Sequence, residues 1–296
     1  MKKIKKILKA ILPYGILYLY RKSKYQDFTD VQHRIETDIL SRYFLKNKEN
    51  GESYFEIAGA KIPDIRNYPD KFRAFIIVFA EVYIFPCYLN DNYNKSIVEV
   101  LDIYTNGGPY GYKDGDFDVS IKKGDVVIDA GSWIGDFAAY ASTKEAITYA
   151  FEPVNSNYEL LQKTAELNRN IYPVQKGLSN RTGKVSISIP KHDAASSIAW
   201  SHTYANSETI SITTLDEFVK ENKIPKVDFI KVDIEGEERN MLKGASWVLK
   251  NYAPKLAICT YHLPDDPQIL EKIILEANPK YKIVHLTRKL FASVVT

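Results

Sequence analysis

The sequence predicts an α/β protein whose mainly parallel sheet has helices on both faces. From Asp125 onward, short apolar runs rich in β-branched residues alternate with longer segments of helical periodicity. Parallel strands need long crossover connections, usually helices, and this alternation supplies them. Acidic residues or a histidine stand at or just after the ends of several apolar runs, where ligands bind in such sheets.

The expected elements follow one another along the chain from residue 126. The apolar runs predict strands at 126–129, 147–151, 172–176, 184–189, 209–212, 227–232, 254–260 and 281–285. Helical spacing predicts helices at about 135–144, 155–168, 214–222, 237–250 and 267–276. The segment His192–Ser207 is rich in Ser and Ala and is expected to form an active-site loop or lid.

The front of the chain divides into a basic amphipathic helical segment, residues 1–25, and an N-terminal cap expected to be helical, residues 26–106. Within the cap, Val31–Phe44 is helix-like amid mixed helix and loop, and Ile76–Phe85 and Ile97–Tyr104 are strand candidates. The glycine-rich segment Thr105–Tyr112 precedes the nucleotide loop described below. It is expected to be either a wall of the active site or a plain β-turn. The remaining residues, 107–296, carry the predicted site.

The first segment is amphipathic and strongly basic. Residues 1–26 hold eight of the 40 basic residues and no acidic one, which leaves 32 basic and 37 acidic residues elsewhere. The apolar stretch between Lys9 and Arg21 has 11 residues, fewer than the ~20 that cross a bilayer. We expect residues 1–25 to lie on an anionic membrane surface, or to pack on their own protein or on a homodimer partner.

Composition excludes several classes. Cys87 and Cys259 lie in apolar surroundings without C-x-x-C spacing, which argues against a disulfide framework or a zinc cluster and fits a reducing cytoplasm. The mildly acidic body lacks the dense basic stripe of a nucleic-acid-binding protein. We therefore expect a cytoplasmic protein, peripheral to the membrane if residues 1–25 bind lipid, with a small-molecule or glycan substrate.

The most informative stretch is a nucleotide-binding pattern. An apolar run ends at Asp129, a loop with Gly131 and Gly135 follows, and a second apolar run ends at Glu152. Glycines permit a tight turn and close backbone approach, and a carboxylate at the second strand end accepts hydrogen bonds from ribose hydroxyls. The loop lacks G-x-G-x-x-G, so the expected ligand is an adenosine without a pyrophosphate, of which S-adenosylmethionine is the common one.

Within this pattern we assign individual roles. Asp129 is expected to support the loop and the ligand ammonium, while Gly131, Ser132 and Gly135 form the loop that passes under the amino-acid part. Glu152 is expected to take the ribose hydroxyls. Asn157 is expected to be either a ribose or adenine neighbour or a first-turn helix residue.

A second constellation follows the predicted strand 227–232. Asp233, Glu235 and Glu237 come together at a strand-to-helix turn in which Gly236 permits tight geometry. Repulsion among the carboxylates should raise the pKa of at least one, which suits a general base, and Lys231 offsets their charge. Glu238 fits the first turn of the following helix, where an acid interacts well with the helix dipole.

His262 emerges from the apolar strand 254–260 into a turn rich in Pro and Asp. A neutral imidazole there could take a proton near neutral pH, so we count it as either a catalytic or substrate-binding residue or a structural one. Alternatively, Asp233, Glu235 or Glu237 could hold a divalent cation together with His262. We expect no metal and treat this as the second interpretation.

These pieces, in this order, resemble the FkbM family of S-adenosylmethionine-dependent methyltransferases. The resemblance covers roughly Gly107–His285. It rests on the segments 127–135, 151–153 with Asn157, 214–216, 230–237 and 242–245. Ser132 stands where the family usually has Ala. Thr260-Tyr261-His262 keeps the family's His but lacks the Glu before it.

The resemblance implies a Rossmann-like class I methyltransferase fold with a seven-stranded sheet in residues 107–296. It implies O-methylation of a hydroxyl on a sugar, a cell-surface glycan or a related natural product. The candidates for the base that removes the hydroxyl proton rank in the order Asp233, His262 and Glu235. Lys231 is expected to lie beside them in the catalytic site.

Two other functions compete with this one. A non-catalytic component of glycan assembly, recruited to the membrane through residues 1–25, would not need the intact set Asp129, Gly131, Gly135 and Glu152. A nicotinamide-dependent oxidoreductase on the same fold is disfavoured because G-x-G-x-x-G is missing. RNA methylation is disfavoured by the acidic body.

Overall fold

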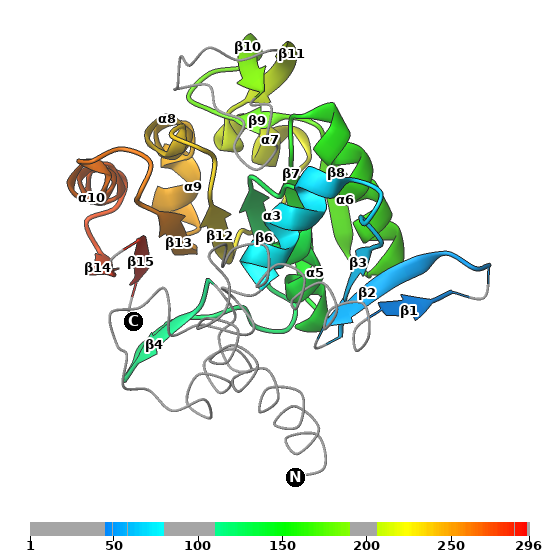
Figure 1. Cartoon of the computed structure of the whole chain (residues 1–296). Coiled ribbons are helices and arrows are strands. Elements are labelled where there is room, and N and C mark those ends of the chain that lie inside the picture. The colour runs from blue at the N-terminus through cyan, green and yellow to red at the C-terminus, as the bar shows by residue number, and fades with distance from the viewer. Residues whose placement is uncertain are drawn as a thin grey trace, which may run out of the picture.

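A seven-stranded sheet forms the centre of the computed structural model, which describes residues 45–48, 50–57, 59–79, 110–189, 206–286 and 288–294 (Figure 1). Its strands are β6 (Val126–Ala130), β7 (Ile147–Phe151), β8 (Ile171–Val174), β12 (Phe229–Val232), β13 (Lys255–Cys259), β14 (Tyr281–His285) and β15 (Lys289–Val294). Their order across the sheet is β14-β15-β13-β12-β6-β7-β8. Strand β15 runs antiparallel to β13 and β14, and the other neighbouring pairs are parallel.

The central strands β6 and β12 are buried along their whole length. Both are continuous apolar runs interrupted by one charged residue each, as expected for strands covered on both faces. Their register places Asp129 beside Lys231 and Val232 beside Ala130. The carboxyl ends of β6, β7, β12 and β13 therefore meet at one edge of the sheet, where Asp129, Glu152, Asp233 and His262 lie.

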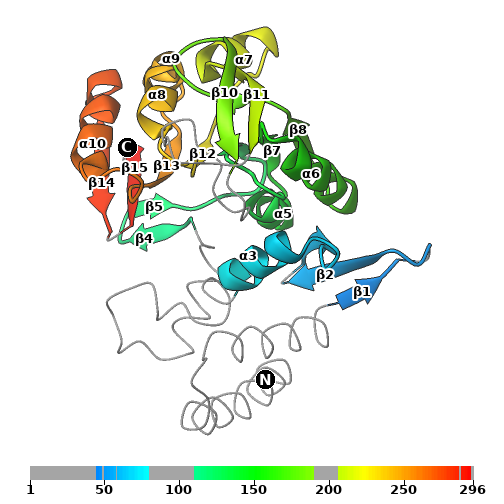
Figure 2. The ribbon, with the colours of Figure 1, turned by 45° about the horizontal axis from the view of Figure 1, so that its top comes forward.

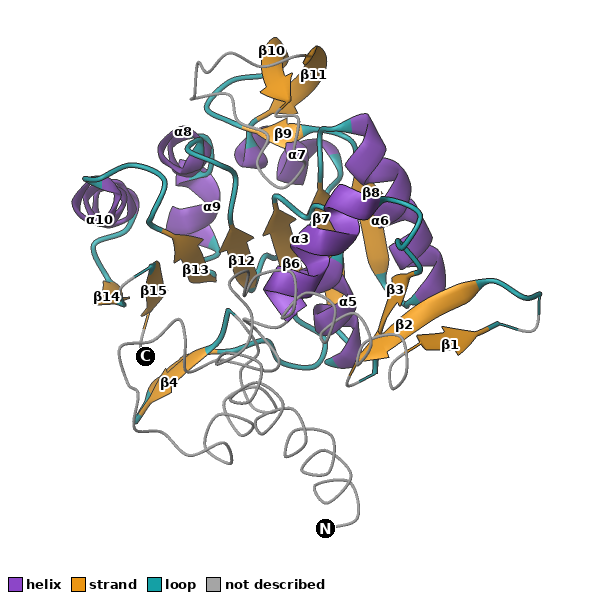
Figure 3. Ribbon diagram, viewed as in Figure 1, coloured by secondary structure: helices purple, strands orange, loops and turns teal. Residues whose placement is uncertain are grey.

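Helices cover both faces of this sheet (Figure 3). They are α5 (Asp136–Thr143), α6 (Asn155–Leu167), α7 (Leu215–Glu221), α8 (Glu238–Lys243), α9 (Ser246–Asn251) and α10 (Asp266–Ala277). Helices α7 to α10 pack on the face that presents Ile128, Ile230 and Ile258. Helices α5 and α6 pack on the opposite face. The sequence predicted this two-sided arrangement correctly.

Two smaller sheets flank the main one. Strands β9 (Gly177–Leu178), β10 (Gly183–Ile189) and β11 (Asn206–Thr213) form a sheet with order β10-β11-β9, in which β10 and β11 are antiparallel. The short hairpin of β4 (Tyr112–Asp114) and β5 (Phe117–Val119) packs on the same face of the main sheet as α5. Neither β4, β5 nor β15 was predicted from the sequence.

The described part of the N-terminal cap contains a meander and one helix (Figure 2). Strands β1 (Leu45–Asn47), β2 (Ser53–Ile57) and β3 (Ala60–Pro63) are antiparallel neighbours, and α3 (Pro69–Phe79) follows them. Their apolar side chains, including Phe55, Phe72 and Phe75, form one cluster with Ile134, Ala139 and Leu160. The expectation of mixed helix and loop up to residue 75 was therefore wrong for β1 to β3.

The strand predicted at Ile76–Phe85 was also wrong where the structure describes it, because α3 extends through Phe79. Pro69 and Asp70 at its start are favourable helix-initiating residues, and Phe72 and Phe75, about one turn apart, face the core. Helical packing thus outweighs the strand preference of the β-branched residues that follow.

The single helix predicted at 237–250 is instead the pair α8 and α9. The break falls at Gly244, where a Cβ would lie 2.1 Å from the backbone oxygen of Ser179. Helix α9 begins anew with the Asp216 carboxylate accepting hydrogen bonds from the backbone N–H groups of Trp247 and Val248. This partner is distant in sequence, so helical periodicity alone did not reveal the break.

Several predictions fall outside the described residues: the segment 1–25, the helix at Val31–Phe44, the strand at Ile97–Tyr104 and most of the loop His192–Ser207. Among the helices that the structure does describe, none combines the length and apolar character needed to span a bilayer.

Gly131 is fixed by contact between two strand ends. Its φ is +76°, and a Cβ there would lie 1.9 Å from the backbone oxygen of Asp233. We expect Gly131→Ala to lower the free energy of unfolding by about 3 kcal/mol, measured by urea denaturation. Gly124 has a similar φ of +79° but open space around it. Gly124→Ala should therefore cost only about 1 kcal/mol, and equal losses would contradict the close contact.

Candidate active site

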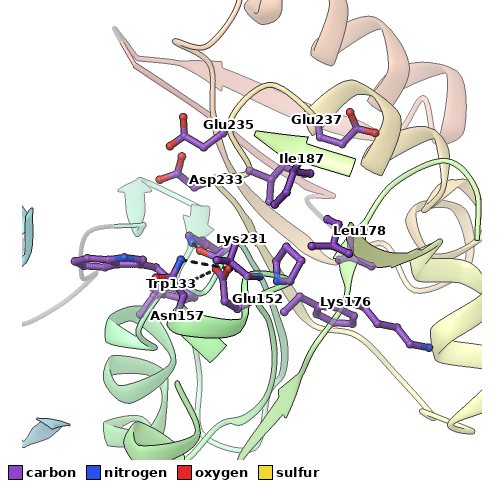
Figure 4. Close-up of a pocket in the computed structure, with 18 of the residues that line it drawn as sticks. Trp133, Glu152, Asn157, Lys176, Leu178, Ile187, Lys231, Asp233, Glu235 and Glu237 are labelled. Atoms are coloured by element: carbon purple, nitrogen blue, oxygen red, sulfur yellow. Dashed lines mark hydrogen bonds between the residues drawn. The ribbon is translucent and has the colours of Figure 1, made fainter. Parts of the chain in front are cut away.

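A cavity of about 440 Å³ opens at the carboxyl edge of the sheet. Figure 4 shows Glu152, Asn157 and Trp133 on one side of it and Asp233, Glu235 and Glu237 on the other. Its apolar lining comes from the end of β7 and the turn before α6, from β9 and from the β10–β11 pair, through Phe151, Pro153, Val154, Leu178, Ile187 and Ile210. The volume falls within the range of small-molecule sites.

Hydrogen bonds to neighbouring backbone carbonyls hold the loop that contains Gly131 and Gly135 in place. The backbone N–H groups of Gly131 and Ser132 both donate to the Phe151 carbonyl, and the Ser132 hydroxyl donates to the Asp129 carbonyl at 2.8 Å. Gly135 faces Leu161 and Thr164 so closely that a Cβ would lie 2.7 Å from Leu161. Of these loop residues, Gly131 lines the cavity, whereas Ser132 and Gly135 stand behind its wall. Their part in the predicted cofactor site is to shape the loop.

Glu152 projects into the cavity from the end of β7. Its two carboxylate oxygens accept hydrogen bonds from the backbone N–H groups of Trp133, at 3.0 Å, and Val154, at 2.9 Å. The Asn157 amide donates to the same carboxylate at 3.4 Å. Burial raises the pKa of Glu152 to about 7, although these hydrogen bonds and the charge of Lys71 oppose the rise. The structure thus brings Glu152 and Asn157 together, although Asn157 also lies in the first turn of α6.

Asp129 and Lys231 form a buried ion pair at the base of the cavity. The Lys231 ammonium lies 3.0 Å from the Asp129 carboxylate and donates to the Gly131 carbonyl at 2.6 Å. Burial lowers the pKa of Lys231, but Asp129, Asp233 and Asp136 outweigh burial and raise it above its ordinary value. Lys231 therefore stays charged and cannot act as a base. Asp129 is fully buried and does not line the cavity, so it supports the loop through Lys231.

Asp233 is held by two tyrosines. Tyr110 donates to one carboxylate oxygen at 2.9 Å and Tyr261 to the other at 3.0 Å. Burial raises the pKa of Asp233, but the charges of Lys231 and His262 and the two tyrosine hydroxyls outweigh it, so the net shift is downward. The Asp233 side chain is 22% exposed and lines the cavity. It is an oriented carboxylate that stays ionised at neutral pH.

His262 occupies a different environment from the one predicted. Its Nε2 lies 3.4 Å from Glu235 and 3.7 Å from Asp233, and its Nδ1 lies 3.0 Å from Glu238. Burial lowers the pKa of His262, but the contacts with Glu235 and Glu238 outweigh burial and raise it to about 10. The prediction of a neutral imidazole that takes a proton near pH 7 was wrong, because three carboxylates surround the ring.

The remaining acids divide between the cavity and the protein. Glu235 lines the cavity and has a φ of +54°, a strained value for a residue other than glycine. Glu237 also lines it but accepts hydrogen bonds from Ser179, at 2.6 Å, and from Asn240. Ligand atoms of Asp233, Glu238 and His262 lie within 4.8 Å of one another, the span that a cation site requires. The imidazolium form of His262 supplies positive charge at that place.

Residues 124–283 match the family model described as the Methyltransferase FkbM domain, which is more than half of the chain. The chain belongs to the FkbM methyltransferase family. Family membership and the mostly parallel seven-stranded sheet together give a class I methyltransferase-like fold, which confirms the fold predicted from the sequence.

The chain is also similar to individual proteins of known function or structure. The hexuronic acid methyltransferase AglP of Haloferax volcanii is 32% identical over 167 residues, which cover 55% of this chain and 67% of that protein. The crystal structure of an FkbM methyltransferase from Methylobacillus flagellatus is 23% identical with a TM-score of 0.47. That match covers 64% of this chain and about half (49%) of the other chain. Fibrillarin of Aeropyrum pernix, solved with bound S-adenosyl-L-methionine, matches 58% of this chain at 14% identity and a TM-score of 0.38.

Sequence reasoning missed three residues that reach this site. Asp136 lines the cavity beside Lys231, and burial raises its pKa to about 6. Tyr261 directly precedes His262 at a strand end, a position that could have drawn attention to it. Lys71 contacts Asn157 from α3, and no nearby motif in the sequence marks it. Tyr110, by contrast, lies in the predicted wall segment Thr105–Tyr112 and does line the cavity.

His262 should stabilise the fold most at low pH. Its folded pKa of about 10 exceeds its ordinary 6.5, so its contribution is complete below about pH 6.5 and is lost as pH rises through 10. We expect His262→Gln to lower the free energy of unfolding by about 3 kcal/mol at pH 6. The loss should shrink as pH approaches 10, as measured by urea denaturation.

His285→Gln is the matched control, since His285 pairs with Glu271 at 2.7 Å but both side chains are well exposed. Its loss should stay below about 1 kcal/mol. A deficit in His262→Gln that is the same at pH 6 and pH 10 would contradict the charged imidazole.

Proposed function

We propose that this protein is an S-adenosylmethionine-dependent O-methyltransferase that acts on a hydroxyl group of an acidic sugar, such as a hexuronic acid in a cell-surface glycan. The observation that carries the proposal is one cavity with acidic side chains on two opposite sides. Glu152 lies where a ribose would be bound. Asp233 lies across the cavity and accepts hydrogen bonds from Tyr110 and Tyr261. The family assignment supports methyl transfer, and the name of the H. volcanii relative supports the acidic sugar.

The lining of the cavity fits the proposed cofactor. Pro153, Val154 and Leu178, with Ile187 and Ile210, form an apolar slot suited to an adenine ring. Glu152 can accept hydrogen bonds from both ribose hydroxyls. The carboxylates of Glu235 and Glu237 give the opposite side negative charge, which favours a ligand bearing a sulfonium and an ammonium group.

The bound cofactor would supply an electrophilic methyl group on sulfur. The chain's own task is then to orient the acceptor hydroxyl and take its proton. When the acceptor oxygen takes the methyl group, the cofactor would leave as S-adenosylhomocysteine and the hydroxyl proton would pass to the Asp233 carboxylate. Asp233 can take this proton because it is ionised and because Tyr110 and Tyr261 fix its direction, although its lowered pKa makes it a weaker base than the carboxylate of raised pKa expected from the sequence.

Tyr261 is the more exposed of the two tyrosines that bind Asp233, so we expect the acceptor to approach from its side. Its ring is 42% exposed, lines the cavity, and has the Arg288 guanidinium 4.3 Å from its centre. The Arg288 guanidinium suits a sugar carboxylate, because its planar set of donors can bind both carboxylate oxygens. Lys231 and His262 act through Asp233, since their positive charges hold its pKa low.

We expect Asp233→Asn to bind S-adenosylhomocysteine within about twofold of the unchanged protein, while turnover falls by about 10²- to 10⁴-fold. The amide keeps the shape of the side chain but cannot accept the proton. Calorimetry measures the binding, and methyl transfer to a hexuronic acid acceptor measures turnover. Asp114→Asn, at the exposed end of β4, is the control. Unchanged turnover in Asp233→Asn would remove it from this role.

The affinities for S-adenosylhomocysteine and for NAD distinguish a methyltransferase from the competing oxidoreductase. The unchanged protein should bind S-adenosylhomocysteine at least about tenfold more tightly than NAD, because the loop lacks the pyrophosphate-binding glycines. Tighter binding of NAD in equilibrium calorimetry would favour the oxidoreductase. Activity that disappears with a chelator and returns with a divalent cation would favour the cation interpretation of Asp233 and His262.

Contact of residues 1–25 with a membrane surface is a separate proposal, supported by the lysines of that segment. Liposomes containing anionic lipid should carry the full chain in flotation and should carry less of a chain lacking these residues. Equal flotation of the two chains would contradict membrane contact through residues 1–25. Self-association of the full chain, absent from the shortened one, would indicate that the segment packs on a homodimer partner.

A further inference from the structure

Helix α3 contributes to the cavity from outside the residues that match the family model. Those residues begin at 124, whereas α3 spans Pro69–Phe79. Ala74 lines the cavity, and Lys71, one turn earlier, is only 4% exposed. Phe72 and Phe75 anchor the helix in the cluster that includes Leu160 of α6. The N-terminal cap is therefore packed directly against the side of the site that holds Glu152.

Lys71 begins a short chain of hydrogen bonds that ends at Glu152. Its ammonium donates to the side-chain oxygen of Asn157, in a short contact, and to the Ser156 hydroxyl at 3.3 Å. The Asn157 amide nitrogen in turn donates to Glu152 at 3.4 Å. An ammonium has donors and no acceptor, so it fixes which way the amide points. The NH₂ of Asn157 must then face the Glu152 carboxylate.

The charge of Lys71 also acts on Glu152. Glu152 is the nearby buried acid whose pKa the charge of Lys71 lowers. Lys71 and Glu152 thus face each other across one amide, an arrangement that favours the ionised carboxylate.

We propose that Lys71 is a positioning residue of the cofactor site, which acts through Asn157 to keep Glu152 oriented and ready to accept the ribose hydroxyls. The N-terminal cap thereby completes the cofactor pocket of the FkbM domain. The inference rests on the proposed function, because it takes S-adenosylmethionine as the ligand of Glu152. Asn157 then has a role beyond that of a first-turn helix residue.

The chain of hydrogen bonds from Lys71 through Asn157 to Glu152, called the relay below, predicts that ligand binding depends on pH. Without Lys71 the pKa of Glu152 rises further above 7, so a larger share of the side chain is protonated at neutral pH and fewer lone pairs remain for the ribose. Lys176, Lys231 and Asp136 line the same cavity and stay unchanged in the variants below. At pH 9 the carboxylate is ionised with or without Lys71, so the difference should fade.

The test is calorimetric binding of S-adenosylhomocysteine at pH 6, 7 and 9 by the full-length chain and its variants. Lys71→Met should weaken binding about tenfold at pH 7, more at pH 6, and less than about threefold at pH 9. Lys71→Arg keeps the charge and should restore most of the affinity. Lys163→Met, on the exposed side of α6, removes a lysine from the helix that carries Asn157 and should leave the affinity unchanged.

Asn157→Leu breaks the relay from its other end and keeps the test decisive if Lys71→Met folds poorly. Adding Lys71→Met to Asn157→Leu should cost clearly less affinity than Lys71→Met alone. A loss in Lys71→Met that is equal at all three pH values, or additive with Asn157→Leu, would overturn the relay and leave the proposed function standing. Failure of the unchanged protein to bind S-adenosylhomocysteine at any pH would overturn both.

Discussion

The buried ion pair between Lys231 and Asp129 is the interaction on which the site depends. The Lys231 ammonium lies between the neighbouring strands β6 and β12, 3.0 Å from the Asp129 carboxylate, and it donates to the carbonyl of Gly131. Gly131 in turn touches the backbone of Asp233 so closely that no side chain fits between them. One cation thus ties the glycine loop to the strand end that carries the proposed base. Its charge also favours the ionised form of Asp233.

A second positive charge plays a similar part on the far side of Asp233. The imidazole of His262 lies among Asp233, Glu235 and Glu238, whose mutual repulsion would otherwise be uncompensated at this corner. Glu238 also accepts a hydrogen bond from the backbone N–H of Ile234, which secures the tight turn after β12. The acidic corner is therefore stable because its charges are paired, and Glu235 can face the cavity in a strained backbone conformation.

Local patterns were enough to predict most strands of the sheet, though not β15, and the residues at the strand ends. Apolar runs gave β6, β7 and β12, and the ends of these runs gave Asp129, Glu152 and Asp233. The sequence could not show that Asp129 turns to Lys231 instead of the cavity, because that depends on strand register. It could not show the proton held by His262, since Glu235 and Glu238 come from another element. Lys71 lay beyond prediction because α3 meets Asn157 only in the folded chain.

In the proposed function, the two sides of one cavity have different tasks: Glu152 and its supports bind the cofactor, and Asp233 and its tyrosines bind the acceptor. The most direct measurement is mass spectrometry of a glycan containing hexuronic acid after incubation with the protein and S-adenosylmethionine carrying a labelled methyl group. The account predicts that the glycan gains one labelled methyl on a sugar oxygen. Binding of the cofactor without methyl transfer to any sugar acceptor, or transfer to a group other than a hydroxyl, would contradict it.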